Sequence, residues 1–144
     1  MLQTDISVAS YWVTNPSNDF YGNVAAGSDF YGIWYEIKDH PDGPSATIDI
    51  CPKGNPLGYV ANNIAHSNIR FGLRIFTLAP RLYPCQPPAN FSDVDDPWKY
   101  NPSIQSVFSN FTLYKNQESG LLAEQVGNVV FNNFTIAESI QTGV

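Results

Sequence analysis

Apolar and polar positions along the chain recur in one pattern that is written four times. The four stretches cover residues 20–33, 60–73, 108–121 and 131–144, and they align without gaps. In each stretch, short apolar and polar runs are interrupted by Asn, Ser or Gly, which is typical of short strands separated by bends. A helix would instead place its apolar residues three or four positions apart. The pattern therefore predicts strands that repeat along the chain.

Five columns of this alignment hold the same kind of residue in all four copies. Two columns are apolar: Phe20, Val60, Phe108 and Phe131, and then Ala25, Ala65, Leu113 and Ile136. Two more are a bend column of Gly22, Asn62, Asn110 and Asn133, and a small polar column of Ser28, Asn68, Asn116 and Ser139. The last is a glycine column: Gly32, Gly72, Gly120 and Gly143. Because Gly and Asn adopt the left-handed backbone most readily, the bend column predicts one bend made four times. We also expect a positive φ at Gly72, which would exclude a β-branched residue there.

The repeat period predicts the fold class. The glycines at positions 32, 72, 120 and 143 are 40, 48 and 23 residues apart, so the bare repeat is in the low twenties, as in solenoids. Leucine-rich repeats share this period, but their leucine consensus is absent. We predict an all-β, right-handed, single-stranded parallel β-helix of about four coils, in which stacked side chains and turn asparagines form ladders. The alternative is an accidental likeness among Asn-rich strands.

The predicted domain is a single one that covers residues 1–144, as a segment of a larger ectodomain. Two long insertions, at about 39–56 and 79–102, interrupt it and are rich in proline and glycine. Further strands are expected at residues 6–14 and 33–37, and no helix is convincing. An open-ended solenoid needs caps, and the chain shows no amphipathic cap at either end.

Composition and charge exclude several classes of partner. The net charge is −6, and charged residues make up only 14% of the chain, against a usual value of about 25%. This charge argues against nucleic acid and anionic membranes as partners, and against tight binding of a polyanionic sugar. No apolar run is long enough to span a bilayer, and the first ten residues lack the features of a signal peptide.

The two cysteines lie one in each insertion, at Cys51 and Cys85. Insertions that leave the same corner of consecutive coils emerge about 4.8 Å apart. We therefore predict a disulfide between the two cysteines, which implies an oxidising compartment and stabilises the fold by roughly 3–4 kcal/mol on the chain-entropy model. The alternative is two unrelated free thiols.

Three sequons, at Asn90, Asn110 and Asn133, indicate a secreted glycoprotein. Asn90 lies in the second insertion and is the preferred glycan acceptor. Asn110 and Asn133 belong to the bend column, so each is either an acceptor or a member of an asparagine ladder.

No catalytic residue, metal site or cofactor is predicted. His66 has no histidine among its column mates, so a surface histidine is the simpler interpretation. Asp93, Asp95 and Asp96 lack the spacing of a calcium loop. The acidic residues Asp29, Glu36 and Glu124 fall in different columns, so they do not form the carboxylate pair of a glycosidase.

An aromatic cluster follows the first repeat: Phe30, Tyr31, Trp34 and Tyr35. Flat apolar rings stack on sugars, but they also pack between strands and loops, and the sequence leaves both open. The residues we consider as sugar-facing are Trp34, Tyr35 and His66.

Several phrases are similar to a known family. Four stretches resemble the β-helix region of fibrocystin and fibrocystin-like proteins: residues 11–37, with T-N-P and A-A-G-S; residues 40–45, with H-P-D-G-P-S; residues 51–76, with A-H-S-N; and residues 114–139. They also resemble the related cell-migration-inducing hyaluronan-binding family. The resemblance covers most of the chain and is least at 79–102. It implies a large cell-surface or ciliary ectodomain that serves as a receptor or structural protein; the hyaluronan-related branch is linked to hyaluronan breakdown. It carries over no catalytic residue.

We therefore expect a non-catalytic extracellular scaffold or adhesion segment whose insertions face a partner. The expected partners are other extracellular proteins, further segments of the same ectodomain, or glycans. One alternative is a carbohydrate-active hyaluronidase- or lyase-like β-helix with its site near His66 and Asp29. The other is a sugar-binding module that uses Trp34 and Tyr35. Apolar insertion tips would favour the scaffold, and a carboxylate cluster on one solvent face would favour the enzyme.

Overall fold

The computed structural model describes residues 7–87 and 98–144 and is all-β in this part of the chain. Its strands are β1 (Ala9–Val13), β2 (Phe20–Tyr21), β3 (Val24–Ala26), β4 (Tyr31–Glu36), β5 (Val60–Ala61), β6 (Ile64–His66), β7 (Phe71–Leu78), β8 (Ser106–Tyr114), β9 (Ser119–Val126) and β10 (Val129–Ala137). The described helices are two three-residue 3₁₀ turns, η1 (Gly43–Ser45) and η2 (Pro52–Gly54), and neither is long enough to cross a membrane.

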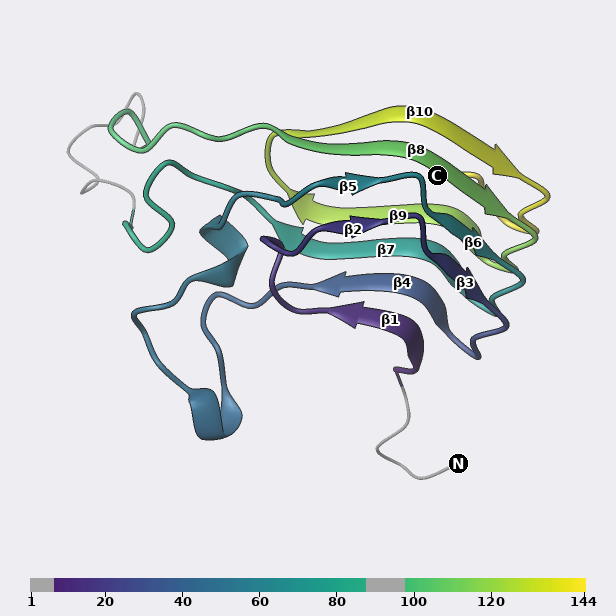
Figure 1. The fold of residues 1–144 in the computed structure, drawn as a ribbon, viewed down its shortest axis with the longest axis horizontal. Coiled ribbons are helices and arrows are strands. Elements are labelled where there is room, and N and C mark those ends of the chain that lie inside the picture. Colours follow the sequence, from purple (N-terminus) through teal and green to yellow (C-terminus); the bar gives the residue numbers. More distant parts are fainter. Residues whose placement is uncertain (1–6, 88–97) are drawn as a thin grey trace.

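The chain alternates between two sheets, as a β-helix requires. The first sheet has the order β1-β4-β7-β9, and the second has the order β2-β5-β8-β6-β3, with β10 also paired to β8. Every pairing between these strands is parallel. In Figure 1 the strands of the first sheet run one way and those of the second sheet run the other way. We call the two sheets together the strand stack.

The strand register joins the same columns that the sequence repeats. Phe20 pairs with Val60, Val60 with Phe108, and Phe108 with Phe131. The inward apolar side chains of successive strands therefore lie on one another and form a continuous core. This stacking removes apolar surface from water along the whole stack.

The bend column turns at a left-handed residue each time. The φ angles are 67° at Gly22, 58° at Asn62, 55° at Asn110 and 54° at Asn133. The Asn110 amide donates to Oδ1 of Asn62 at 3.0 Å, and the Asn133 amide donates to Oδ1 of Asn110 at 2.8 Å. The outer corner of the stack thus carries an exposed asparagine ladder.

A second ladder is fully buried. Both the backbone N–H and the Nδ2 of Asn68 donate to Oδ1 of Asn116, at 3.3 and 2.9 Å. Asn116 donates in turn to the carbonyl of Ala65 at 3.1 Å, and Ser28 donates its backbone N–H to Asn68 at 3.1 Å. Buried amides are stable when they are hydrogen-bonded in this way, and here each bond joins neighbouring layers of the stack.

The glycine column exists for a reason other than the one expected. Gly72 is not among the residues with a positive φ, so that expectation is wrong. A Cβ atom at Gly72 would instead lie 2.6 Å from Nδ2 of Asn116 and 2.8 Å from the carbonyl oxygen of Gly120. A Cβ atom at Gly32 would lie 2.7 Å from Nδ2 of Asn68. At Gly32 and Gly72, glycine is required because the buried ladder and the next strand occupy the space that a side chain would fill.

Candidate functional site: the disulfide-linked loops

Two long loops leave the strand stack at the same edge. The first loop (37–59) follows β4, and the second loop (79–105) follows β7, the neighbouring strand of the first sheet. In Figure 1 both loops extend from the end of the molecule to which β4 and β7 point. Parallel strands bring their carboxyl ends to one edge of a sheet, so the sequence order itself places these loops together.

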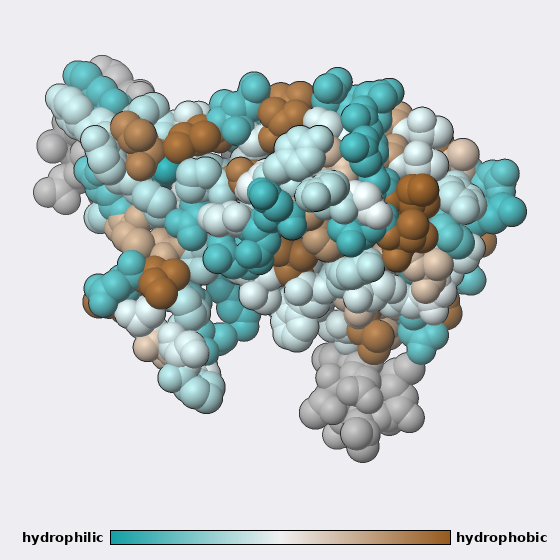
Figure 2. Space-filling model, viewed as in Figure 1, coloured by the Kyte–Doolittle hydropathy of each residue, from teal (hydrophilic) through white to brown (hydrophobic). Residues whose placement is uncertain are grey.

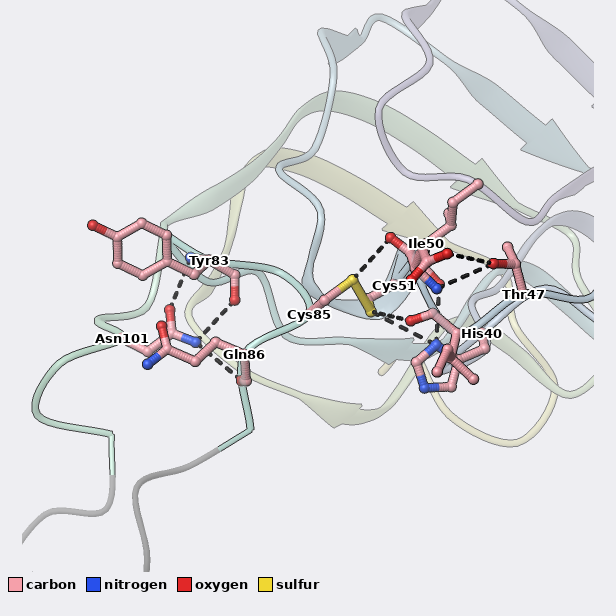
Figure 3. The surroundings of a disulfide bond; sticks show 10 residues. His40, Thr47, Ile50, Cys51, Tyr83, Cys85, Gln86 and Asn101 are labelled. Carbon is pink, nitrogen blue, oxygen red and sulfur yellow. Dashed lines mark hydrogen bonds between the residues drawn. A yellow bond between two sulfur atoms is a disulfide. The ribbon is translucent and has the colours of Figure 1, made fainter.

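The predicted disulfide joins these loops. Cys51 in the first loop is bonded to Cys85 in the second, with the two Cα atoms 5.2 Å apart (Figure 3). The two residues are 34 positions apart in sequence. Cys51 is buried, whereas Cys85 is exposed.

Backbone hydrogen bonds also join the bases of the loops. The N–H of Ala79 donates to the carbonyl of Lys53, and that of Arg81 donates to Gly54, both at 3.0 Å. Within the second loop the buried side chain of Asn101 accepts from the Tyr83 N–H and donates to the Tyr83 carbonyl, both at 2.9 Å (Figure 3). The described parts of the loops, residues 37–59, 79–87 and 98–105, are therefore irregular in shape but held in position by these contacts.

Large apolar side chains are exposed on both loops. Their exposed fractions are 79% for Ile48, 51% for Ile50, 50% for Leu82, 53% for Tyr83 and 63% for Tyr100. Hydrophobic residues are visible at this end of the molecule in Figure 2. All five belong to loops that lie at one end of the molecule (Figure 1), where exposed apolar surface suits protein association.

A cavity of about 330 Å³ lies between the first loop and the start of the strand stack. Its lining includes Trp12, Thr14, Asn15, Lys38, His40 and Asp42. Lys38 Nζ and Asp42 Oδ2 are 2.7 Å apart, and this hydrogen bond raises the pKa of Lys38 and lowers the pKa of Asp42. The cavity therefore combines an indole ring with an ion pair that is already formed.

The structure contradicts the sugar-facing interpretation of Trp34 and Tyr35. Tyr35 points into the core, where its ring meets Phe108 edge-on at 5.3 Å and burial raises the pKa of its hydroxyl. Trp34 points outward, but it is only 7% exposed because Trp12 stacks on it at 5.4 Å. Trp12 itself is 60% exposed and is the ring that faces solvent. The signal for this lies in β1: Trp12 pairs directly with Trp34.

The remaining candidates have structural contacts or lie apart. His66 stacks on Tyr114 at 4.7 Å, and its Nδ1 is 3.0 Å from the hydroxyl of Ser67. Asp29 lies exposed between β3 and β4, and Glu36 is half-buried at the end of β4. Glu36 and Glu124 both pair with Phe76, so these two carboxylates share a column and the expectation that they fall in different columns is wrong. Asn90, Asp93, Asp95 and Asp96 lie outside the described residues.

Two carboxylates on the outer face of the first sheet are paired with arginines. Glu118 Oε1 lies 2.7 Å from Arg70 Nε, and this hydrogen bond raises the pKa of Arg70. Glu124 Oε2 lies 3.3 Å from Arg74 Nη2. Over residues 7–87 and 98–144, no group of three or more His, Cys, Asp or Glu side chains is placed to hold a metal ion.

Comparison with known proteins decides the family. The family model described as the CEMIP beta-helix matches residues 2–73. The chain belongs to the CEMIP β-helix family. It is 37% identical to fibrocystin-L of Mus musculus over 146 residues, which cover 100% of this chain and 3% of that protein.

Other relatives are named for hyaluronan. Cell surface hyaluronidase CEMIP2 of Homo sapiens is 29% identical over 93% of this chain and 10% of its own length. The cell migration-inducing and hyaluronan-binding protein of Mus musculus is 32% identical over 79% of this chain and 9% of its own length. This CEMIP β-helix thus spans a small part of each of these relatives, and its resemblance to fibrocystin-like proteins is confirmed.

Proposed function

We propose that the chain is a non-catalytic scaffold segment of a large extracellular or cell-surface protein, and that the disulfide-linked loops are its partner-facing surface. The strand stack is a right-handed parallel β-helix of about four coils in this proposal. The observation that carries the proposal is the set of exposed apolar side chains on two loops that are covalently joined.

The described parts of the loops favour association because their contacts hold them in place before a partner arrives. Ordering a loop on binding costs free energy, and a loop that is already ordered avoids this cost. The disulfide and the buried Asn101 hold the segments that carry Ile50 and Tyr83. The partner is therefore an extracellular protein, or another segment of the same protein, with a complementary apolar surface.

Two carboxylates at the first sheet that are paired with arginines support a role without catalysis. A glycosidase needs one carboxylic acid and one free carboxylate on either side of the bond that is cleaved. On the outer face of the first sheet, Glu118 and Glu124 are each held by an arginine instead. The disulfide fits the oxidising environment of a cell surface.

The test uses fluorescent tetramers of the chain, applied to living cells and measured by flow cytometry. Ile48→Asp combined with Leu82→Asp places charge on both loops and is expected to lower the cell-bound signal at least tenfold, or about 1.4 kcal/mol. Val24→Asp, at a residue that is 54% exposed on β3, is the matched control and is expected to bind like the parent. Equal binding by the loop variant would contradict the proposal, as would shortening of hyaluronan chains by the parent.

A second candidate function is sugar binding at the cavity beside Trp12. An exposed indole offers a flat surface for a sugar ring, and Asn15 and Asp42 line the same cavity with hydrogen-bonding groups. This candidate replaces Trp34 and Tyr35 with Trp12 as the stacking residue. It predicts that Trp12→Ala, and not the loop variant, abolishes the cell-bound signal.

A further inference from the structure

The two sulfur atoms of the disulfide have different neighbours (Figure 3). The Sγ atom of Cys51, a residue that is 8% exposed, lies 3.6 Å from Nδ1 of His40. The Sγ atom of Cys85, an exposed residue, lies 3.3 Å from the carbonyl oxygen of Asp49. Cys51 Sγ also lies 3.8 Å from the carbonyl oxygen of Ile48. Both sulfur atoms therefore meet a carbonyl dipole, nearer for Cys85, but of the two only Cys51 Sγ also meets a ring nitrogen.

The position of the hydrogen on His40 follows from its second contact. Nδ1 of His40 lies 3.1 Å from the carbonyl oxygen of Ile50. A carbonyl oxygen only accepts hydrogen bonds, so Nδ1 carries the hydrogen. The same N–H is shared with Sγ of Cys51 in a three-centre arrangement. Nδ1 bears this hydrogen whether the ring is neutral or protonated.

This asymmetry decides which sulfur is the better leaving group. The His40 N–H stabilises negative charge on Cys51 Sγ. Carbonyl oxygens disfavour negative charge on both sulfur atoms, but the one beside Cys85 is nearer and no N–H donor offsets it among the described contacts. Thiol–disulfide exchange is faster when the departing sulfur is the more stable thiolate and the attacked sulfur is accessible. Both conditions select attack at Cys85 with departure of Cys51.

Space for an attacking thiol exists on both sides of the bond. Two cavities, of about 500 and 520 Å³, are each lined by Cys51 and Cys85. The first is also lined by Lys53 and Arg81, and its Lys53 forms an ion pair with Asp39 at 3.1 Å. Asp39 also lines this cavity and offsets the charge of Lys53, so Arg81 is the cation that favours an anionic thiolate there.

We propose that Cys85 is a thiolation site for low-molecular-weight thiols. A thiolate attacks Sγ of Cys85, the bond between Cys85 and Cys51 breaks, and its electron pair leaves with Sγ of Cys51. The Cys51 thiolate accepts the His40 N–H, and a mixed disulfide remains on Cys85. One disulfide is consumed and one is formed, so no other oxidant or reductant is needed. The hydrogen bonds from Ala79 and Arg81 to the first loop still join the loop bases, so only the loop tips are released.

The test treats the oxidised chain with reduced glutathione, quenches samples with N-ethylmaleimide at early times, and maps both groups by peptide mass spectrometry. We expect glutathione on Cys85 and maleimide on Cys51. His40→Phe removes the N–H donor and is expected to slow the initial rate by about fivefold. His66→Phe, at the other histidine of the chain, is the matched control and is expected to react like the parent.

Two results would overturn this assignment. Glutathione on Cys51, or divided evenly between the cysteines of the parent chain, would show that the two sulfurs are not distinguished. A parent-like rate for His40→Phe would show that the histidine does not assist departure of Cys51. The first readout uses the unmodified sequence, so it stands even where a variant folds poorly. It is also independent of whether the loops bind a partner.

Discussion

In the strand stack a contact made in one layer recurs in the next, whereas in the disulfide-linked loops most contacts occur once. Asn62, Asn110 and Asn133 form one ladder, and Asn68 and Asn116 form another. Over the described loop residues 37–59, 79–87 and 98–105, the contacts are single ones: one disulfide, one buried asparagine, two ion pairs between lysine and aspartate, and a few backbone hydrogen bonds. A repeated contact can be read from an alignment of the chain with itself, and a single contact cannot.

The difference also separates stability from binding. The stack buries its apolar side chains against one another, and its amides are satisfied by neighbouring layers. The loops leave large apolar side chains exposed, and a bond outside the core holds them in place. Damage to the stack should therefore unfold the chain, whereas damage to the loops should change their surface and leave the strands intact.

The largest expected effect is at the glycine column. Gly72→Val places a side chain where Asn116 and the Gly120 carbonyl already lie, and we expect a loss of about 4 kcal/mol or more in the free energy of unfolding. Gly143→Val is the matched control, because a Cβ atom there meets only Ile136, at 3.7 Å. Urea denaturation followed by circular dichroism measures both. A Gly72 variant as stable as the Gly143 variant would disprove the steric role of the column.

An intermediate effect is expected from removing the disulfide. Cys51→Ser with Cys85→Ser should lower the free energy of unfolding by roughly 3–4 kcal/mol, because the unfolded chain regains the entropy of an open loop. The far-UV circular dichroism spectrum of the folded variant should match that of the parent, since neither cysteine lies in a strand. Loss of the strand signal in the native buffer would show that the stack depends on the loops, contrary to the comparison above.

The smallest effect is expected in the core. Within the described residues, the hydroxyl of Tyr35 is buried without a hydrogen-bond partner, so Tyr35→Phe should raise the free energy of unfolding by about 1 kcal/mol at neutral pH. Burial raises the pKa of Tyr35, because it disfavours the charged phenolate in the folded state. The free energy of unfolding that depends on this proton is therefore fully present below the ordinary tyrosine pKa of about 10, and it is lost as the pH rises through the folded-state pKa.

Thermal melts between neutral pH and strongly alkaline pH measure this difference. The parent should lose stability above about pH 10, and Tyr35→Phe should lose less over the same range. Identical pH profiles would show that the Tyr35 hydroxyl reaches water in the folded state.

The amino-acid sequence was sufficient to predict the strand register of the stack. The columns that begin at Phe20 and Ala25 are the columns that pair in the sheets, because a parallel stack places equivalent positions side by side. The disulfide followed from the same reasoning, since loops after neighbouring parallel strands must emerge together. The conformation of Gly72 was predicted wrongly, because a glycine signals either an unusual φ or a lack of space, and only the neighbouring layer distinguishes the two.

Side-chain direction in β4 was harder to predict. Apolar residues occupy every position from Tyr31 to Tyr35 except Gly32, so alternation does not show which of them face the core. The structure turns Tyr35 inward and Trp34 outward, beneath Trp12 of the preceding strand. The exposed loop tips and the contact of His40 with Cys51 depend on irregular backbone, which no periodic pattern describes.

The strand register also has a consequence for how such a chain tolerates change in length. One column of the stack holds Phe20, Val60, Phe108 and Phe131. Its successive members are 40, 48 and 23 positions apart in the sequence, yet they remain paired. Additional residues at the loop edge alter only the entropy of closing the loop, and doubling a loop costs only about 0.6 kcal/mol. Loop length is therefore nearly neutral for the fold, so new surfaces can be acquired by insertion at this edge while the two ladders keep the register.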